Sequence, residues 1–237
     1  MKAHERLRVI VLSGAGEELV SVLGSDGWSD YPLQFVGDGL LAAVRDEVAG
    51  APDLARECRR RLEDRIWTGD RELAEALAAA VGDGPDPDLR ELAVSLEELA
   101  EVLEGDPVHG GGRIDRQTGE VWPQSATDDL EFRGDEEEDE DDEDRWLYVE
   151  SEGSRDGYRD MELFIADVEE SDPAFAEELS RALGGRRPFR RFGDAVWRRP
   201  EQLTRWQWFS NDRHRGRARH WLAVEGITPT PPSSVIA

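Results

Sequence analysis

Residues 110–123 read GGGRIDRQTGEVWP, and they decide the fold class because they interrupt a chain whose other apolar patterns are mostly helical. Ile114 and Val121 flank the polar segment DRQTGE. Thr118-Gly119 within that segment suits a tight turn in which the glycine adopts the left-handed conformation. The stretch therefore predicts a β-hairpin.

Residues 145–150, RWLYVE, predict a further strand. Trp146 and Tyr148 alternate there with Leu147 and Val149, so that each pair occupies its own face. Together with the hairpin, this strand predicts a small antiparallel sheet.

Helical spacing dominates on both sides of this sheet. The apolar sets that predict helices are Leu40–Leu41–Val44–Val48, Leu54–Cys58–Leu62–Ile66, Leu73–Leu77–Val81, Leu99–Val102–Leu103, Tyr158–Met161–Phe164–Ile165–Val168, Phe175–Leu179–Ala182–Leu183, Phe189–Phe192–Val196, Leu203–Trp206–Phe209 and Ala218–Trp221–Leu222. Capping residues are predicted at Asp70, Ser95 and Asp172. Residues 6–16, RLRVIVLSGAG, instead predict a buried strand followed by a turn.

These elements predict an α+β protein that is mostly helical, with a small antiparallel sheet followed by a C-terminal helical bundle. Residues 82–88, GDGPDPD, have the glycine and proline content of a linker. We therefore expect a mostly helical N-terminal region over 1–87 and a second module over 88–227. A disordered tail is expected over 228–237.

The net charge of −25 argues against a free-standing nucleic-acid binder and against adhesion to anionic membranes. The charge is uneven. Between residues 186 and 221, eleven arginines against three acids give +8, so the rest of the chain carries −33. No apolar run approaches the roughly 20 residues that span a bilayer. Lys2 is the only lysine, a codon bias that suggests a bacterial source; we expect a cytoplasmic protein.

Four segments after residue 95 occur in a specific order: GGGRIDRQTGEVWP, GYRDMELFIADV, RALGGRRPFRRFGDAV and RWQWFSNDRHRGRARHWLAVEGI. In this wording and order, residues 95–227 resemble the bacterial uncharacterised protein family numbered 0158. The resemblance implies a hairpin followed by a helical C-terminal half. It implies no activity and no catalytic residues. The N-terminal part resembles the extensions of actinobacterial members.

An acidic insert is expected over residues 128–144, and its residues 135–144, DEEEDEDDED, are ten consecutive acids. Their mutual repulsion predicts an extended, solvated segment. Three interpretations follow: a loop insert without a role, a tethered polyanion that competes for the arginine-rich surface at about millimolar effective concentration, or a mimic of nucleic acid.

The arginines of residues 186–221 are interleaved with aromatic residues, which is the composition of single-stranded nucleic-acid binders. Aromatic residues at helical spacing also predict a core, and arginines also form salt-bridge networks with carboxylates. Arg159 and Asp160 open a helix, where a structural ion pair to Arg190 or Arg191 or a ligand-binding role is possible. The candidate binding residues are Arg159, Asp160, Arg190, Arg191, Trp206, Arg217 and Trp221.

We find no cofactor, metal or catalytic motif. The four histidines lack metal-ligand spacing, and Cys58 lies in a helical stretch typical of an inert thiol. The glycines near Ser13 fit neither a dinucleotide fingerprint nor a nucleophile elbow. Asp115 and Glu120 flank the hairpin turn and are expected to face water.

The first functional hypothesis is therefore a non-enzymatic binding or regulatory protein that engages an unknown protein partner through the arginine and aromatic surface. The second is direct nucleic-acid binding by residues 186–221. The third is an enzyme of unrecognised type with Arg159 and Asp160 in a cleft.

Overall fold

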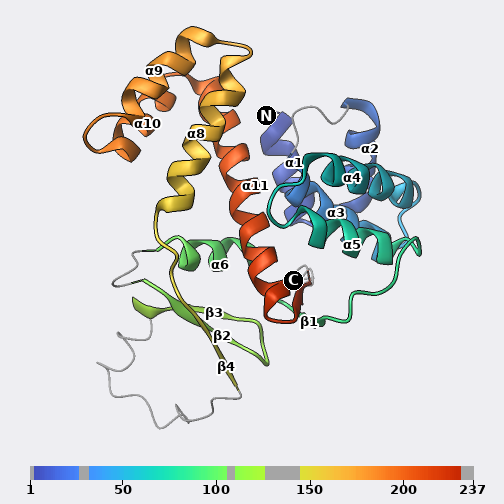
Figure 1. Cartoon of the computed structure of the whole chain (residues 1–237). Coiled ribbons are helices and arrows are strands. Elements are labelled where there is room, and N and C mark those ends of the chain that lie inside the picture. Colours follow the sequence, from blue (N-terminus) through green and yellow to red (C-terminus); the bar gives the residue numbers. More distant parts are fainter. Residues whose placement is uncertain (1–2, 27–31, 106–109, 126–144, 231–237) are drawn as a thin grey trace.

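The computed structural model describes residues 3–26, 32–105, 110–125 and 145–230 (Figure 1). It is an α+β structure in which helices predominate, as predicted. The acidic run at 135–144 lies outside the described residues, so its predicted extended state is not addressed.

The N-terminal part consists of five helices, α1 (Ala3–Leu12), α2 (Gly16–Asp26), α3 (Leu33–Arg45), α4 (Ala51–Arg65) and α5 (Asp70–Ala80). They enclose one apolar cluster, to which α1 contributes Leu7 and Ile10. The strand predicted for residues 6–16 is wrong. Its apolar residues favour a strand, but burying Leu7 and Ile10 on one face while Val9 stays exposed requires helical spacing.

The boundary between α4 and α5 also differs from the prediction. Ile66, expected on the apolar face of its helix, ends α4 in a left-handed conformation and is 80 % exposed. Gly69, not Asp70, precedes α5 as the capping residue. Asp70 is instead the first residue of the helix, and its buried carboxylate accepts a hydrogen bond from the Trp67 backbone N–H at 2.8 Å.

A short parallel pair of strands that the sequence did not predict joins the two ends of the second module. β1 (Arg90–Leu92) pairs with β5 (Ile227–Pro229) in the register Arg90 to Ile227. Thr228 and Pro229 therefore belong to a strand and not to the tail predicted from residue 228. Residues 231–237 are outside the described part, and the domain boundary near residue 87 stays a prediction.

The predicted hairpin is confirmed. β2 (Gly112–Asp115) and β3 (Val121–Pro123) pair antiparallel, and Gly119 has a φ of +82° at the turn. β4 (Trp146–Val149) pairs with the other edge of β2, which gives the strand order β3–β2–β4. The helix α6 (Leu96–Leu103) packs on this sheet, and its predicted cap is confirmed because Ser95 Oγ accepts a hydrogen bond from the Glu98 N–H.

The C-terminal part contains α8 (Arg155–Glu169), α9 (Pro173–Leu183), α10 (Pro188–Trp197) and α11 (Pro200–Val224). The predicted Asp172 cap is confirmed, since its carboxylate accepts the Phe175 N–H at 3.0 Å. The two apolar sets predicted for the last helical stretch belong to one helix, α11.

Helix α11 runs through the middle of the molecule, between the N-terminal helices on one side and α8 on the other (Figure 1). Its first half packs into the cluster of α8, α9 and α10, and Ala218 and Leu222 pack into the cluster of α6 and the sheet. At Gly216 the helix backbone meets the loop before α5. A Cβ added at Gly216 would lie 2.2 Å from the Thr68 carbonyl oxygen.

We predict that Gly216→Ala lowers the free energy of unfolding by about 1–3 kcal/mol, because the backbone of Thr68 must move away. Gly193→Ala in α10 is the matched control, since a Cβ there meets no atom within 4 Å. That variant should gain about 0.5–1 kcal/mol from helix propensity. Urea denaturation measures both; an equal gain in the two variants would show that the contact at Gly216 is unimportant.

Candidate binding site

The arginines of α11 that the sequence offered as a binding surface are mostly committed to internal carboxylates. Asp38 of α3 accepts a hydrogen bond from Arg215 Nη2 at 2.5 Å and another from Arg219. Arg219 is buried and also donates from Nε to the Gln34 side chain at 2.9 Å. Burial opposes ionisation of Asp38, but the two guanidinium groups outweigh it and hold the pKa of Asp38 below its usual value.

A second buried group links α11 to α4 and α5. Arg65 donates to Asp70 at 2.7 Å and to Asp212 of α11 at 2.5 Å. The other oxygen of Asp212 accepts the Gln34 backbone N–H at 2.7 Å. Burial raises the pKa of Asp212 despite the Arg65 charge. The N-terminal helices are therefore attached to α11 largely through charged hydrogen bonds.

Asp160, the buried carboxylate of the predicted Arg159-Asp160 motif, binds α11 on the opposite side. It accepts from Arg213 Nε at 2.9 Å and from Arg217 Nη1 at 2.8 Å, and Arg217 also contacts Glu104. The ion pair of Asp160 with Arg190 or Arg191, one form of the structural role considered for this motif, does not form, because Asp160 binds α11 and the two α10 arginines are exposed. The expectation that Arg159 and Asp160 open a helix is wrong, since α8 begins at Arg155. Asp160 and Arg217 thus act as structural partners in this arrangement.

The two candidate tryptophans lie at the edges of apolar clusters. Trp206 packs against Phe192 and Phe164, with ring centroids 4.9 Å and 5.1 Å away. Trp221 is half-buried against the cluster of α6 and the sheet. Both positions agree with the interpretation that aromatic residues at helical spacing belong to a core. Packing partly covers each ring, so neither offers a fully exposed stacking surface.

Of the arginines that motivated a binding surface, those that stay exposed lie mainly on α10 and the turn before it. Arg186, Arg187, Arg190 and Arg191 are exposed, and so is Arg159 of α8. Arg190 has a loose ion pair with Asp194 at 3.9 Å. Phe189 and Trp197, which are 45 % and 73 % exposed, flank these arginines. We call this set, Arg186, Arg187, Phe189, Arg190, Arg191 and Trp197, the α10 surface.

Ser210 and His214 of α11 lie close to Glu104. The sequence analysis did not find this group, because Glu104 is distant from the other two residues in sequence. His214 Nε2 lies 3.1 Å from Ser210 Oγ and 3.1 Å from Glu104 Oε2. One ring nitrogen cannot both accept the serine proton and donate to the carboxylate, as nucleophile activation requires. Burial and the Arg217 charge also lower the pKa of His214 to about 4. This geometry does not form a catalytic triad.

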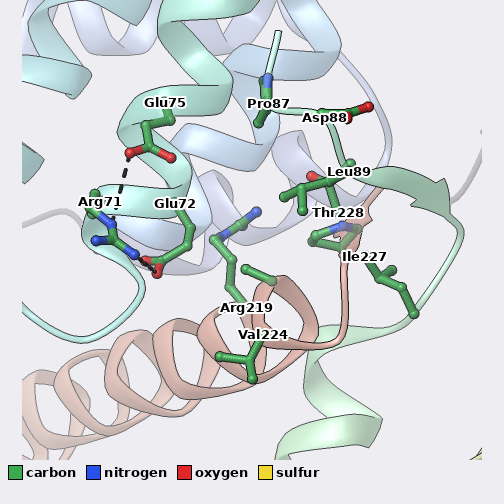
Figure 2. Close-up of a pocket in the computed structure, with 12 residues that line it drawn as sticks. Arg71, Glu72, Glu75, Pro87, Asp88, Leu89, Arg219, Val224, Ile227 and Thr228 are labelled. Atoms are coloured by element: carbon green, nitrogen blue, oxygen red, sulfur yellow. Dashed lines mark hydrogen bonds and ion pairs between the residues drawn. The ribbon is translucent and has the colours of Figure 1, made fainter.

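A small cavity lies between α5, the C-terminal end of α11 and the β1–β5 pair (Figure 2). Its volume of about 240 Å³ is below the roughly 300–1,000 Å³ of typical ligand sites. Arg71 at its rim makes ion pairs with Glu72 and Glu75 at 3.3 Å and 3.8 Å. Its charged rim is therefore occupied by internal pairs, and we do not regard it as a ligand site.

Two further sequence predictions concern single side chains. Asp115 was expected to face water, which is wrong: it is buried, accepts the Gln117 and Thr118 N–H groups and pairs with Arg145 at 2.9 Å. These donors, which close the hairpin turn, hold its pKa low despite burial. Cys58 is buried, and burial raises the pKa of its thiol, so the thiolate is disfavoured.

The described residues contain no group of three or more histidine, cysteine or acidic side chains placed to hold a metal ion. Among the helices of the described ranges, none combines the length and the apolar character needed to cross a bilayer.

Fold and site together define a mostly helical α+β protein with a three-stranded sheet and an exposed arginine and aromatic helix face. Residues 112–234, just over half of the chain, match the model of the Uncharacterised protein family (UPF0158). The chain belongs to this family, as its sequence resemblance implied. No curated protein and no solved structure matches it.

We predict that Asp38→Asn lowers the free energy of unfolding by about 3–5 kcal/mol, because Arg215 and Arg219 lose their shared counter-charge in a buried site. Asp194→Asn, an exposed carboxylate with one loose pair, should change it by less than about 0.5 kcal/mol. Because the pKa of Asp38 is lowered from 3.8, its contribution is present above that pH and is lost in stronger acid. The difference between wild type and Asp38→Asn should therefore shrink below about pH 4 in denaturation measurements.

Proposed function

We propose that this chain is a non-enzymatic binding or regulatory module that engages an acidic segment of a protein partner through the α10 surface. The observation that carries the proposal is the contrast between two sets of arginines. Arg213, Arg215, Arg217 and Arg219 of α11 all bind internal carboxylates or amides. Arg186, Arg187 and Arg191 are exposed and have no ion pair within the described part of the chain.

The aromatic side chains of the same surface support a protein partner. Phe189 and Trp197 expose much of their rings beside the arginines. Tryptophan and arginine are enriched among the residues that dominate protein–protein binding energy. A partner that presents both carboxylates and apolar side chains would match this composition.

Gly193 lies in the middle of α10 and has open space where a Cβ would be. A glycine inside a helix costs about 1 kcal/mol relative to alanine. No described contact of the folded chain requires it. Gly193 lies between Arg190 and Trp197 along α10. Because it has no side chain, a partner can approach the helix backbone closely at this position.

The acidic run enters the proposal as a tethered competitor for the same arginines. Its ten carboxylates are joined to the module by the chain itself, so they compete at high effective concentration. This part of the proposal is supported by charge complementarity alone. We further propose a cytoplasmic, bacterial setting, supported by the composition.

The second hypothesis was nucleic-acid binding by residues 186–221. The internal contacts leave fewer of these side chains available for it. Of the residues that motivated it, Arg217 is bound to Asp160 and Trp206 is packed among apolar rings. The enzymatic alternative is also less favoured, because Asp160 is buried under two arginines.

We predict that the double variant Arg190→Glu/Arg191→Glu weakens binding of a dye-labelled DEEEDEDDED peptide about tenfold or more at low salt, since two attractive charges become repulsive. Fluorescence anisotropy of the peptide measures the affinity. The matched control is Arg60→Glu/Arg61→Glu on α4, which changes the net charge equally at a distant face. Equal weakening by both variants would mean that only net charge matters, and would refute the assignment to α10.

Replacing residues 135–144 by serine and asparagine should tighten peptide binding in the otherwise unchanged chain, because it removes the tethered competitor. To separate competition from general repulsion, the same replacement is made in the Arg190→Glu/Arg191→Glu background. A gain that is as large in that background would contradict competition for α10 and leave only long-range charge.

A further inference from the structure

The two faces of the three-stranded sheet differ in chemistry. Ile114, Val121 and Leu147 are buried on the face that packs into the cluster with α6 and α11. On the opposite face, Arg113 is directly paired with Trp122 on one neighbouring strand and with Tyr148 on the other. These three side chains form one cross-strand row, which we call the sheet row.

Arg113 at the centre of the row is a cation without a carboxylate. Its guanidinium lies 4.0 Å from the centroid of the Trp146 ring and has no ion pair in the described ranges. Two buried donors there, Arg113 Nε and Trp122 Nε1, have no acceptor. A ligand reaches these enclosed atoms only if the two side chains move, and its acceptor oxygen then removes the cost of an unmet buried donor.

Tyr148 at one end of the row is 63 % exposed, and Trp122 at the other end is half-buried. In Figure 1 the helices lie on one side of the sheet, and its other side is turned away from them. The row therefore places an exposed aromatic ring on the strand next to an arginine that has no ion pair in the described ranges.

The size of this face decides between classes of ligand. Three strands of up to four residues cover roughly 14 Å by 13 Å, or about 180 Å². A stable protein interface needs about 800 Å² on each partner. The face is large enough for two or three stacked bases, the number that small antiparallel sheets with exposed aromatic residues hold.

We propose that the sheet row binds single-stranded nucleic acid. One base stacks on Tyr148 and a second contacts Trp122, while Arg113 donates to a phosphate or to a base carbonyl between them. Arg90 and Arg116 add positive charge beside the hairpin turn, where Arg90 Nη2 donates to the Arg116 carbonyl at 2.8 Å. This site is separate from the α10 surface and does not depend on the function proposed for it.

The test uses the full chain and a dye-labelled ten-nucleotide oligo(dT), with anisotropy as the readout. A second set of measurements uses the chain with residues 135–144 neutralised, so that repulsion by the acidic run cannot hide weak binding. Tyr148→Ala should weaken binding about 5- to 150-fold, the equivalent of one lost stacking contact. Tyr148→Phe keeps the ring and should bind as wild type does.

Ile66→Ala is the control, because it removes an apolar side chain that is 80 % exposed at the end of α4, outside both proposed sites, and should leave oligonucleotide binding unchanged. If Arg113 alone contacts a phosphate, the logarithm of affinity should fall with the logarithm of salt at a slope of about −0.7, and further contacts from Arg90 and Arg116 would bring the slope to about −2. Unchanged thermal midpoints for the tyrosine variants exclude loss of folding.

Three results would overturn the proposal. The first is equal affinity of wild type and Tyr148→Ala in the neutralised chain. The second is equally tight binding of a duplex of the same length, which offers no unpaired base to stack. The third is no oligonucleotide binding together with Tyr148-dependent binding of the DEEEDEDDED peptide, which would assign the row to acidic peptides.

Discussion

The charged contacts of α11 hold the molecule together. In its second half, arginines alternate with other residues around the helix, so they point to both sides. Arg215 and Arg219 reach Asp38 of α3, while Arg213 and Arg217 reach Asp160 of α8. Buried ion pairs add little net stability compared with an apolar contact, but they are costly to break and they fix a geometry. The contacts of Asp38 fix the N-terminal helices relative to α11, and those of Asp160 fix α8 relative to α11.

This use of arginine changes the meaning of the charge distribution. The sequence shows an excess of positive charge over residues 186–221, yet carboxylates from α3, α6 and α8 neutralise its C-terminal half. The excess that remains open is confined to α10 and the turn before it. Arg113 of the sheet row, outside the region that composition had emphasised, also has no carboxylate partner in the described ranges. Both sites combine arginine with exposed aromatic rings.

The close approach of Gly69 and Gly216 explains how these charges come within reach of one another. A Cβ at Gly69 would lie 2.1 Å from the Gly216 carbonyl oxygen, so neither backbone could approach as closely with a larger residue. Aromatic contacts continue the same interface, with Phe35 against Trp208 and Trp67 against Phe209 at centroid distances of 5.6 Å and 5.3 Å. Small residues bring the backbones together, and charged and aromatic side chains fill the space beside them.

The sequence by itself determined the elements whose signals are local. The hairpin at Gly119, the caps at Ser95 and Asp172 and the apolar faces of α8 and α9 depend on neighbouring residues and the helical or strand period. The family resemblance was also a property of the sequence. The tertiary structure decided everything that depends on distant partners. It made residues 3–12 helical, paired β1 with β5, and buried Asp115 and Asp160. An arginine's sequence neighbours do not reveal whether a carboxylate more than 50 residues away lies within hydrogen-bonding distance, so only folding could separate the structural arginines from the open ones.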